Sequence, residues 1–184
     1  MARRLFYTRG FDNTSLNDLA REAAVPKGNF YYHFPSKDDV LRAVIEARRV
    51  HIESTLASWA EDYPEPRTRL KRFIAMIVSE RDDLVSYGCP TGSLLTELGK
   101  KRDDLQPYAL SILNLYVDFA ASAFRELGHP VDAARTMALR LLGRAQGAIL
   151  IAHAYGDLTI LDNEIANLDL SLDALERAPG HPAI

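Results

Sequence analysis

The sequence places its densest group of chemically active side chains between residues 27 and 33. The group combines a basic residue, a glycine, an amide, two phenols and an imidazole: Lys27, Gly28, Asn29, Tyr31, Tyr32 and His33. Such a run is too polar to bury and too aromatic for an idle surface. Phenol and imidazole groups can bind DNA phosphates, lysine and asparagine can read base edges, and glycine lets the backbone approach closely. The run therefore predicts a DNA-reading helix; the alternative is a helical hairpin with half-buried tyrosines.

A helix-turn-helix layout surrounds this run. Ser15 is the expected N-cap of a helix over residues 16–24, with Asp18 as its capping-box partner. Pro26 ends that helix, because proline disfavours helix in the residue before it yet fits the first turn of the next one. A second short helix follows over residues 27–33. This arrangement sets its second helix in the major groove of DNA.

The first fifty residues are net positive and the rest of the chain is net negative, as expected for a DNA-binding head on an acidic body. Residues 1–50 hold nine Lys or Arg and six Asp or Glu, a net +3, whereas the whole chain carries −3. A single cysteine cannot form an internal disulfide and fits a reducing compartment. No apolar run approaches the length of a membrane span. We therefore expect a cytoplasmic protein with no membrane partner.

The remaining sequence predicts an all-α fold of about nine helices. Strand-like alternation is nowhere convincing, and glycine and proline lie between the periodic runs. Besides the two helices above, we expect helices over residues 3–9, 37–61, 67–81, 90–99, 103–127, 131–155 and from 158 onward, with a loop over 82–89. The chain then divides into a three-helix helix-turn-helix domain, residues 1–45, and a helical ligand-sensing and dimerisation domain, residues 46–184.

The N-terminal block resembles the TetR family of one-component transcriptional regulators. The resemblance rests on Gly10-Phe11, on Thr14–Ala20 and above all on Val25–Asp38, with its Gly-x-x-Tyr-Tyr-His-Phe-x-Ser-Lys core. It implies that the recognition helix contacts a palindromic operator and that flanking residues bind phosphate. Carried over to this chain, the DNA-binding residues are Ser15, Asn17, Lys27, Gly28, Asn29, Tyr31, Tyr32, His33 and Lys37.

The chain departs from the family pattern in three places. Ala24 stands where glycine is common, and Pro26 stands where serine or threonine is common. The family's first helix also usually begins about ten residues earlier. Two interpretations therefore stay open: a repressor released from its operator by a small-molecule inducer, or a helical ligand-binding dimer with impaired DNA binding.

The last two expected helices predict a homodimer. The helix over residues 131–155 is apolar around most of its circumference, and Leu and Ile recur at helical spacing after residue 158. In the TetR family, the last two helices of each subunit dimerise. The expected interface residues are Leu141, Ala145, Ala148, Ala152, Leu161, Ile165, Leu168 and Leu172.

The resemblance also implies a small-molecule site inside the body. Its candidates are aromatic or polar residues on otherwise apolar helices: Trp59, Phe73, Met76, Tyr87, Tyr116, Phe119, Arg144, Gln146 and His153. Ligand binding would favour a conformation in which the long helix over residues 37–61 has swung and the two recognition helices no longer match the groove spacing. Trp59 lies near the end of that helix and is the residue expected to transmit ligand binding to it.

Cys89 is a candidate for a different mechanism. It precedes Pro90 at an expected helix N-terminus, where the helix dipole favours a thiolate, so an electrophile- or redox-sensing repressor is the alternative to a plain apolar filler. The sequence contains no metal-ligand cluster, phosphate loop or nucleophile–base pair. We therefore expect no enzyme, no cofactor and no metal.

Overall fold

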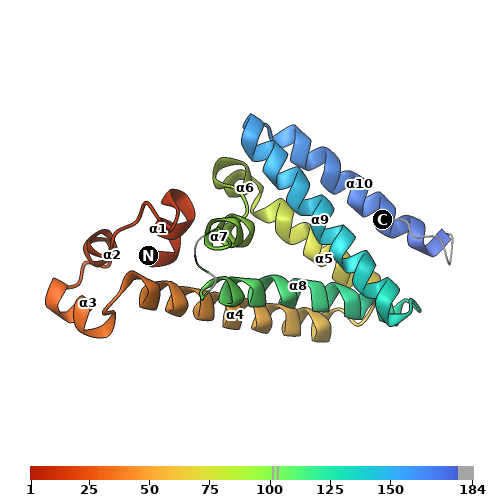
Figure 1. Ribbon diagram of the computed structural model, residues 1–184. Coiled ribbons are helices and arrows are strands. Elements are labelled where there is room, and N and C mark those ends of the chain that lie inside the picture. The colour runs from red at the N-terminus through yellow and green to blue at the C-terminus, as the bar shows by residue number, and fades with distance from the viewer. Residues whose placement is uncertain (101, 103, 178–184) are drawn as a thin grey trace. The chain divides into compact units, whose positions relative to one another are not determined.

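The computed structural model describes residues 1–100, 102 and 104–177, which form ten α-helices and no strand (Figure 1). The all-α prediction is confirmed. The helices are α1 (Ala2–Arg9), α2 (Leu16–Glu22), α3 (Lys27–His33), α4 (Lys37–Asp62), α5 (Pro66–Ser79), α6 (Arg81–Tyr87), α7 (Pro90–Leu98), α8 (Gln106–Glu126), α9 (Val131–Tyr155) and α10 (Leu158–Arg177). None of these described helices combines the length and the apolar composition that crossing a membrane requires.

The prediction of a loop over residues 82–89 is wrong, because most of this segment forms α6. Two aspartates in the first turn of α6 complement the helix dipole, two apolar residues of the helix are buried, and Gly88 ends it with a positive φ of 77°. The next long helix, α8, begins at Gln106. Its expected start, Asp103, lies outside the described residues.

The helix-turn-helix forms where the sequence predicts it, except that α2 ends at Glu22 instead of residue 24. Ser15 caps α2: its Oγ accepts the N–H of Asp18 (3.1 Å), and the Asp18 carboxylate accepts the N–H of Ser15 (3.1 Å). The bounds of α3 are the predicted ones. The buried ring of Phe30 packs 5.4 Å from that of Phe34, so the apolar side of α3 faces the head's core.

Ala24, in the turn between α2 and α3, holds a backbone conformation that alanine disfavours. Its φ is +54°, and it is the only described non-glycine residue with a positive φ. The left-handed conformation costs an L-residue about 1–2 kcal/mol. This positive φ explains why glycine, which adopts it without strain, is common at this position in the sequences that the chain resembles.

Ala24→Gly is expected to raise the free energy of unfolding by about 0.5–1 kcal/mol, because glycine adopts a positive φ without strain. Urea denaturation followed by circular dichroism measures this change. Ala23→Gly is the matched control. Ala23 has a right-handed φ of −68°, so the same substitution there should lower stability by a similar amount. Destabilisation by both substitutions would contradict the strain at Ala24.

The chain forms two compact units whose boundary differs from the division predicted at residue 45. Unit 1 contains Met1–Ile52 together with Pro90–Leu113, and unit 2 contains Glu53–Cys89 together with Asn114–Ile184. Thus α1–α3 share a unit with α7 and the beginning of α8. The functional division into a DNA-binding and a sensing domain stays a prediction, since compactness alone does not assign function.

Within unit 2, α10 packs against α9 and α5, and α6 packs against α9. Ion pairs reinforce this packing at two places. Lys71 Nζ of α5 lies 2.8 Å from a carboxylate oxygen of Asp173, and Arg81 of α6 lies 3.1 Å from Asp162; both aspartates are on α10. These contacts give the last two helices a fixed place in their own subunit.

Candidate nucleic-acid interface

The predicted DNA-reading residues of α3 lie on the surface of unit 1. Tyr32 is 82% exposed and Tyr31 39%, and Lys27, Asn29 and His33 are exposed as well. The alternative of a hairpin with half-buried tyrosines is therefore wrong for Tyr32. A side chain left in water to this extent contributes little to the packing of its own chain, so Tyr32 is accessible to an external partner.

Gly28 leaves open space above the first turn of α3. A Cβ built at this position meets no heavy atom within 4 Å, and the backbone φ there is not positive. Neither internal packing nor backbone conformation therefore requires glycine. The open space above Gly28 is compatible with the predicted close approach of DNA to the backbone.

Ser15 and Asn17 lie exposed at the beginning of α2. The Ser15 hydroxyl is already engaged, because it donates to Asp18 Oδ2 at 2.5 Å while it caps the helix. The hydrogen bonds from Ser15 hold the pKa of Asp18 below its usual range, so this carboxylate is ionised near neutral pH. Asn17 is therefore the freer of the two predicted phosphate contacts.

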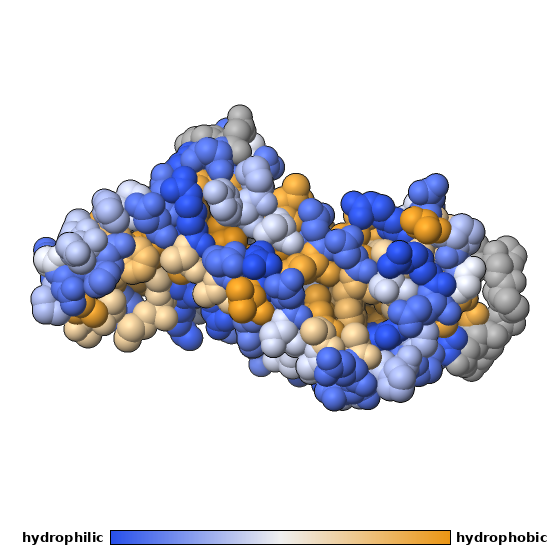
Figure 2. Space-filling model, turned by 90° about the horizontal axis from the view of Figure 1, so that it is seen from below, coloured by the Kyte–Doolittle hydropathy of each residue, from blue (hydrophilic) through white to orange (hydrophobic). Residues whose placement is uncertain are grey.

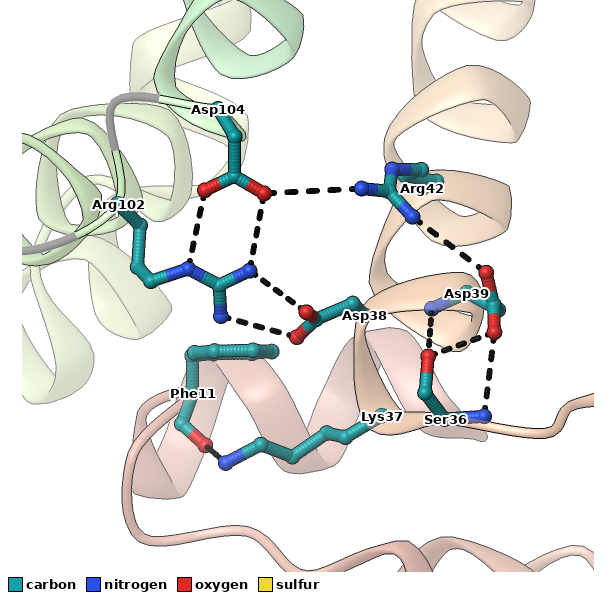
Figure 3. Close-up of polar contacts among 8 residues, drawn as sticks. All are labelled: Phe11, Ser36, Lys37, Asp38, Asp39, Arg42, Arg102 and Asp104. Carbon is teal, nitrogen blue, oxygen red and sulfur yellow. Dashed lines mark hydrogen bonds and ion pairs between the residues drawn. The ribbon is translucent and has the colours of Figure 1, made fainter.

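Lys37 is held by the head itself (Figure 3). Its Nζ donates to the carbonyl oxygen of Phe11 at 2.8 Å and lies 4.1 Å from the centre of the Phe11 ring. The ammonium has three N–H donors, so two remain for a phosphate. The sequence did not indicate the role of Phe11, whose side chain is buried next to that of Phe6.

A second group of charges adjoins Lys37. Arg102 donates to both carboxylate oxygens of Asp38, at 3.0 and 2.6 Å, and to both of Asp104, each at 3.1 Å (Figure 3). Arg42 Nη2 lies 3.6 Å from Asp104. Hydrogen bonds from Arg102 hold the pKa of Asp38 and of Asp104 below the usual range. All four side chains belong to unit 1.

Glu97 of α7 binds the loop between α1 and α2. The N–H of Phe11 donates to Glu97 Oε2 at 2.9 Å, and the N–H of Asp12 donates to Oε1 at 2.7 Å. Gly10 has a φ of +81°, and a Cβ there would lie 3.4 Å from Oε1 of Glu97. The positive φ favours glycine at this position, whereas a Cβ there would make only an ordinary contact with the carboxylate.

Some of the candidate ligand-binding residues come together in unit 2. The ring of Trp59 lies 6.1 Å from that of Phe119, and the ring of Phe73 lies 5.7 Å from that of Tyr116. The guanidinium of Arg72, which the sequence did not single out, lies 5.8 Å from the Trp59 ring. One aromatic pair thus links α4 to α8, and the other links α5 to α8.

The other candidates have partners elsewhere in unit 2. Arg144 pairs with Glu164 of α10 at 2.6 Å, and His153 Nδ1 lies 2.8 Å from the carbonyl oxygen of Val85. Gln146 Nε2 donates to Cys89 Sγ at 3.2 Å. Of the remaining two candidates, Met76 is half-buried and Tyr87 is 38% exposed.

Comparison with known proteins decides the family. Residues 1–44 match the family model described as "Bacterial regulatory proteins, tetR family". The chain is 30% identical, over 179 residues, to an HTH-type transcriptional regulator in the lacX 3′ region of Lactococcus lactis subsp. lactis. That alignment covers 94% of this chain and 88% of the relative. The chain belongs to the TetR family.

Two further matches extend the comparison. This TetR-family chain is 31% identical over 114 residues to the HTH-type transcriptional repressor DhaR of Mycobacterium sp. (strain GP1). The alignment covers 61% of this chain and 56% of DhaR. The crystal structure of a TetR transcriptional regulator from Legionella pneumophila superposes with a TM-score of 0.80 at 21% identity, over 92% of each chain. The fold is therefore that of TetR-type regulators.

Most of the predicted dimer residues are core residues of the TetR-family subunit itself. Six are at most 3% exposed within the single chain, so they have no surface left to bury against a partner: Leu141, Ala145, Ala152, Leu161, Leu168 and Leu172. The structure corrects their assignment, because the stripe they form faces their own subunit. Ala148 and Ile165 are half-buried, and their role at an interface stays a prediction.

A different stripe of α9 and α10 is exposed. On α9 it carries Leu139, Gly143, Gly147, Leu150, Ile151 and Ala154, and on α10 it carries Ala166, Leu170 and Ala174. Both sets recur at helical spacing, so each lies on one face of its helix. On the side of the molecule drawn in Figure 2, by contrast, hydrophobic residues lie in separate groups among hydrophilic ones.

Proposed function

We propose that this TetR-family regulator is a repressor that binds palindromic operator DNA as a homodimer and leaves it when a small molecule binds. The observation that carries the proposal is the exposed face of α3. Tyr32 is 82% exposed there, and the neighbouring contact candidates Asn29, Tyr31 and His33 are exposed as well. A cytoplasmic location is part of the proposal, because an operator-binding protein acts on the chromosome. The names of the relatives describe transcriptional regulators, which supports the regulatory role.

Direct contacts to operator DNA are proposed for the exposed residues of α3. Lys27 and Asn29 lie at its beginning, where an inserted helix meets base edges, and Tyr31, Tyr32 and His33 follow toward the sugar–phosphate backbone. Lys37, at the start of α4, binds phosphate with the donors that Phe11 leaves free.

Dimerisation is proposed through the exposed stripe of α9 and α10. Leu150 is 64% exposed and Leu170 66%, while Gly143 and Gly147 leave open space in which a partner helix can approach closely. A dimer is physically required, since one short helix makes few base contacts and a two-fold pair reads two half-sites.

The inducer site is proposed among the aromatic pairs of unit 2. Trp59 and Phe119, together with Phe73 and Tyr116, offer apolar and aromatic surface of the kind that small ligands bind. Trp59 belongs to unit 2, whereas α4 begins in unit 1, so this one helix joins the proposed sensing and DNA-reading residues. A ligand that binds better to one arrangement of α4 shifts the population of heads able to match the operator.

A redox switch at Cys89 is not the favoured alternative. The sulfur already accepts a hydrogen bond from Gln146 of α9, and the relatives named above are described only as transcriptional regulators or repressors. If peroxide changes the operator affinity of Cys89→Ser in the same way as that of the wild type, this alternative is excluded.

A gel-shift experiment tests the proposed function. DNA flanking the protein's own gene is incubated with the purified protein at low salt, with unrelated duplex as competitor. We expect a retarded band that survives competition, because sequence-specific protein–DNA binding typically exceeds non-specific binding by about 10³-fold or more. A band that the competitor removes completely would contradict operator binding and would favour a ligand-binding dimer with an inactive head.

A further inference from the structure

Two side chains outside the segment that matches the family model hold the head of unit 1 in place. Glu97 is 86 residues from Phe11 in the chain, and Arg102 is 64 residues from Asp38. The matching segment ends at residue 44. The segment Pro90–Leu113 nevertheless belongs to the same compact unit as the head.

The contacts of these two side chains converge on the residues around Lys37. Glu97 accepts the N–H groups of Phe11 and Asp12 in the loop between α1 and α2. The carbonyl and ring of Phe11 in turn hold the Lys37 ammonium. Arg102 binds Asp38, the next residue after Lys37, through two parallel hydrogen bonds. Its guanidinium also lies 5.9 Å from the centre of the Phe11 ring (Figure 3).

We propose that Glu97 and Arg102 are positioning residues for operator binding: they fix the loop between α1 and α2 and the start of α4, and thereby the Lys37 ammonium, without contacting DNA themselves. The proposal rests on the operator-binding function proposed above. It makes residues 90–113 part of the DNA-reading unit, so the head depends on α7 and the segment after it.

The strength of these contacts is sufficient for such a role. Hydrogen bonds to ionised groups, and two-pronged arginine–carboxylate pairs in particular, are shorter and stronger than neutral ones. The side chains of Arg102 and Asp38 are 27% and 31% exposed, so water screens the pair less than it screens a fully exposed one. Arg102 also binds Asp104, so its guanidinium is held on two edges.

The test measures operator affinity by fluorescence anisotropy at several salt concentrations, with the full-length protein and the DNA fragment found by gel shift. Glu97→Gln and Arg102→Lys are conservative changes, and Arg102→Met removes the ion pair. Each is expected to weaken binding about tenfold, which corresponds to the loss of one charge-assisted hydrogen bond. Circular dichroism verifies that each variant is folded at the temperature of measurement.

The salt dependence separates positioning from direct contact. Loss of a phosphate contact lowers the slope of log affinity against log salt by about one, so Lys37→Ala should lower it. Glu97→Gln removes no cation, so any fall in its slope reports a displaced Lys37 ammonium and not a lost contact of residue 97 itself. In the double variant Arg102→Met/Lys37→Ala the slope should equal that of Lys37→Ala alone if Arg102 acts only through Lys37. A further fall in the double variant shows that Arg102 contacts DNA directly, and the positioning role is overturned.

Arg81→Met is the matched control. Arg81 also pairs with an aspartate distant in the sequence, Asp162, but both lie in unit 2. This variant should bind operator like the wild type. If the Glu97 and Arg102 variants bind like Arg81→Met, the proposal is overturned while the repressor function stands.

Hydrogen exchange gives a readout that does not depend on DNA. The amides of Phe11 and Asp12 donate to Glu97, so they should exchange faster in Glu97→Gln than in the wild type, whereas amides of unit 2 should not change. Unchanged exchange at both amides would overturn the proposal. If the wild type itself binds no operator, the proposed function has failed, and hydrogen exchange alone then decides whether Glu97 orders this loop.

Discussion

Replacing Tyr32 with alanine is expected to weaken operator binding about 100-fold, because each of the two heads in a dimer loses a hydrogen bond to a charged phosphate. The stability of the protein should change by less than about 1 kcal/mol, since surface substitutions away from special features rarely cost more. Tyr32 is 82% exposed, and its one recorded ring contact is with His33, at 5.3 Å. Anisotropy with operator DNA and urea denaturation measure the two quantities.

Tyr155→Ala is the control for this prediction. Tyr155 is 77% exposed at the end of α9, so its removal alters a similar exposed ring outside the head. It should leave the operator affinity unchanged. Equal affinities of the Tyr32→Ala variant and the wild type would show that the exposed face of α3 does not read DNA.

Replacing Leu150 with glutamate is expected to convert the dimer to a monomer. The side chain is 64% exposed in the single chain, so the change costs the subunit little, but it places a charge in the proposed apolar interface. Operator affinity should then fall by about 100-fold or more, because the second half-site no longer binds as part of the same molecule. Light scattering coupled to size exclusion measures the mass, and anisotropy measures the affinity.

Val78→Glu is the matched change on another surface. Val78 is an exposed aliphatic residue of α5 in the same unit, outside α9 and α10. This variant should stay dimeric and bind operator normally. If Leu150→Glu also stays dimeric, the exposed stripe of α9 is not the interface.

The head was predictable from sequence because its signals are local. The capping pair Ser15 and Asp18 lies three residues apart, and Pro26 marks the turn, so the bounds of α3 could be read directly. Its exposed aromatic run was also recognisable as a candidate binding surface, because these residues follow one another in the sequence. The family resemblance and the structure agree on this part of the chain. The agreement is physically expected, because the contacts that determine the local structure here are between residues close in sequence.

What the sequence could not provide depends on long-range contacts. Glu97 and Arg102 are ordinary charged residues in the sequence, and only the fold brings them to Phe11 and Asp38. The sequence also assigned core residues of the last two helices to the dimer interface, for a related reason. Leucine spacing on α10 shows that one face is buried but not whether it is buried against its own subunit or a second one, and Leu168 and Leu172 face their own core.

Enrichment from a random-sequence duplex library tests the central claim most directly, because it probes DNA binding, sequence specificity and two-fold symmetry together. The protein is incubated with the library at moderate salt, bound DNA is amplified, and the enriched sequences are determined over several rounds. We predict an inverted repeat whose half-sites are spaced for two recognition helices on one face of the duplex. Failure to enrich any sequence, or enrichment of a site without two-fold symmetry that binds a single chain, would contradict a dimeric operator-binding regulator.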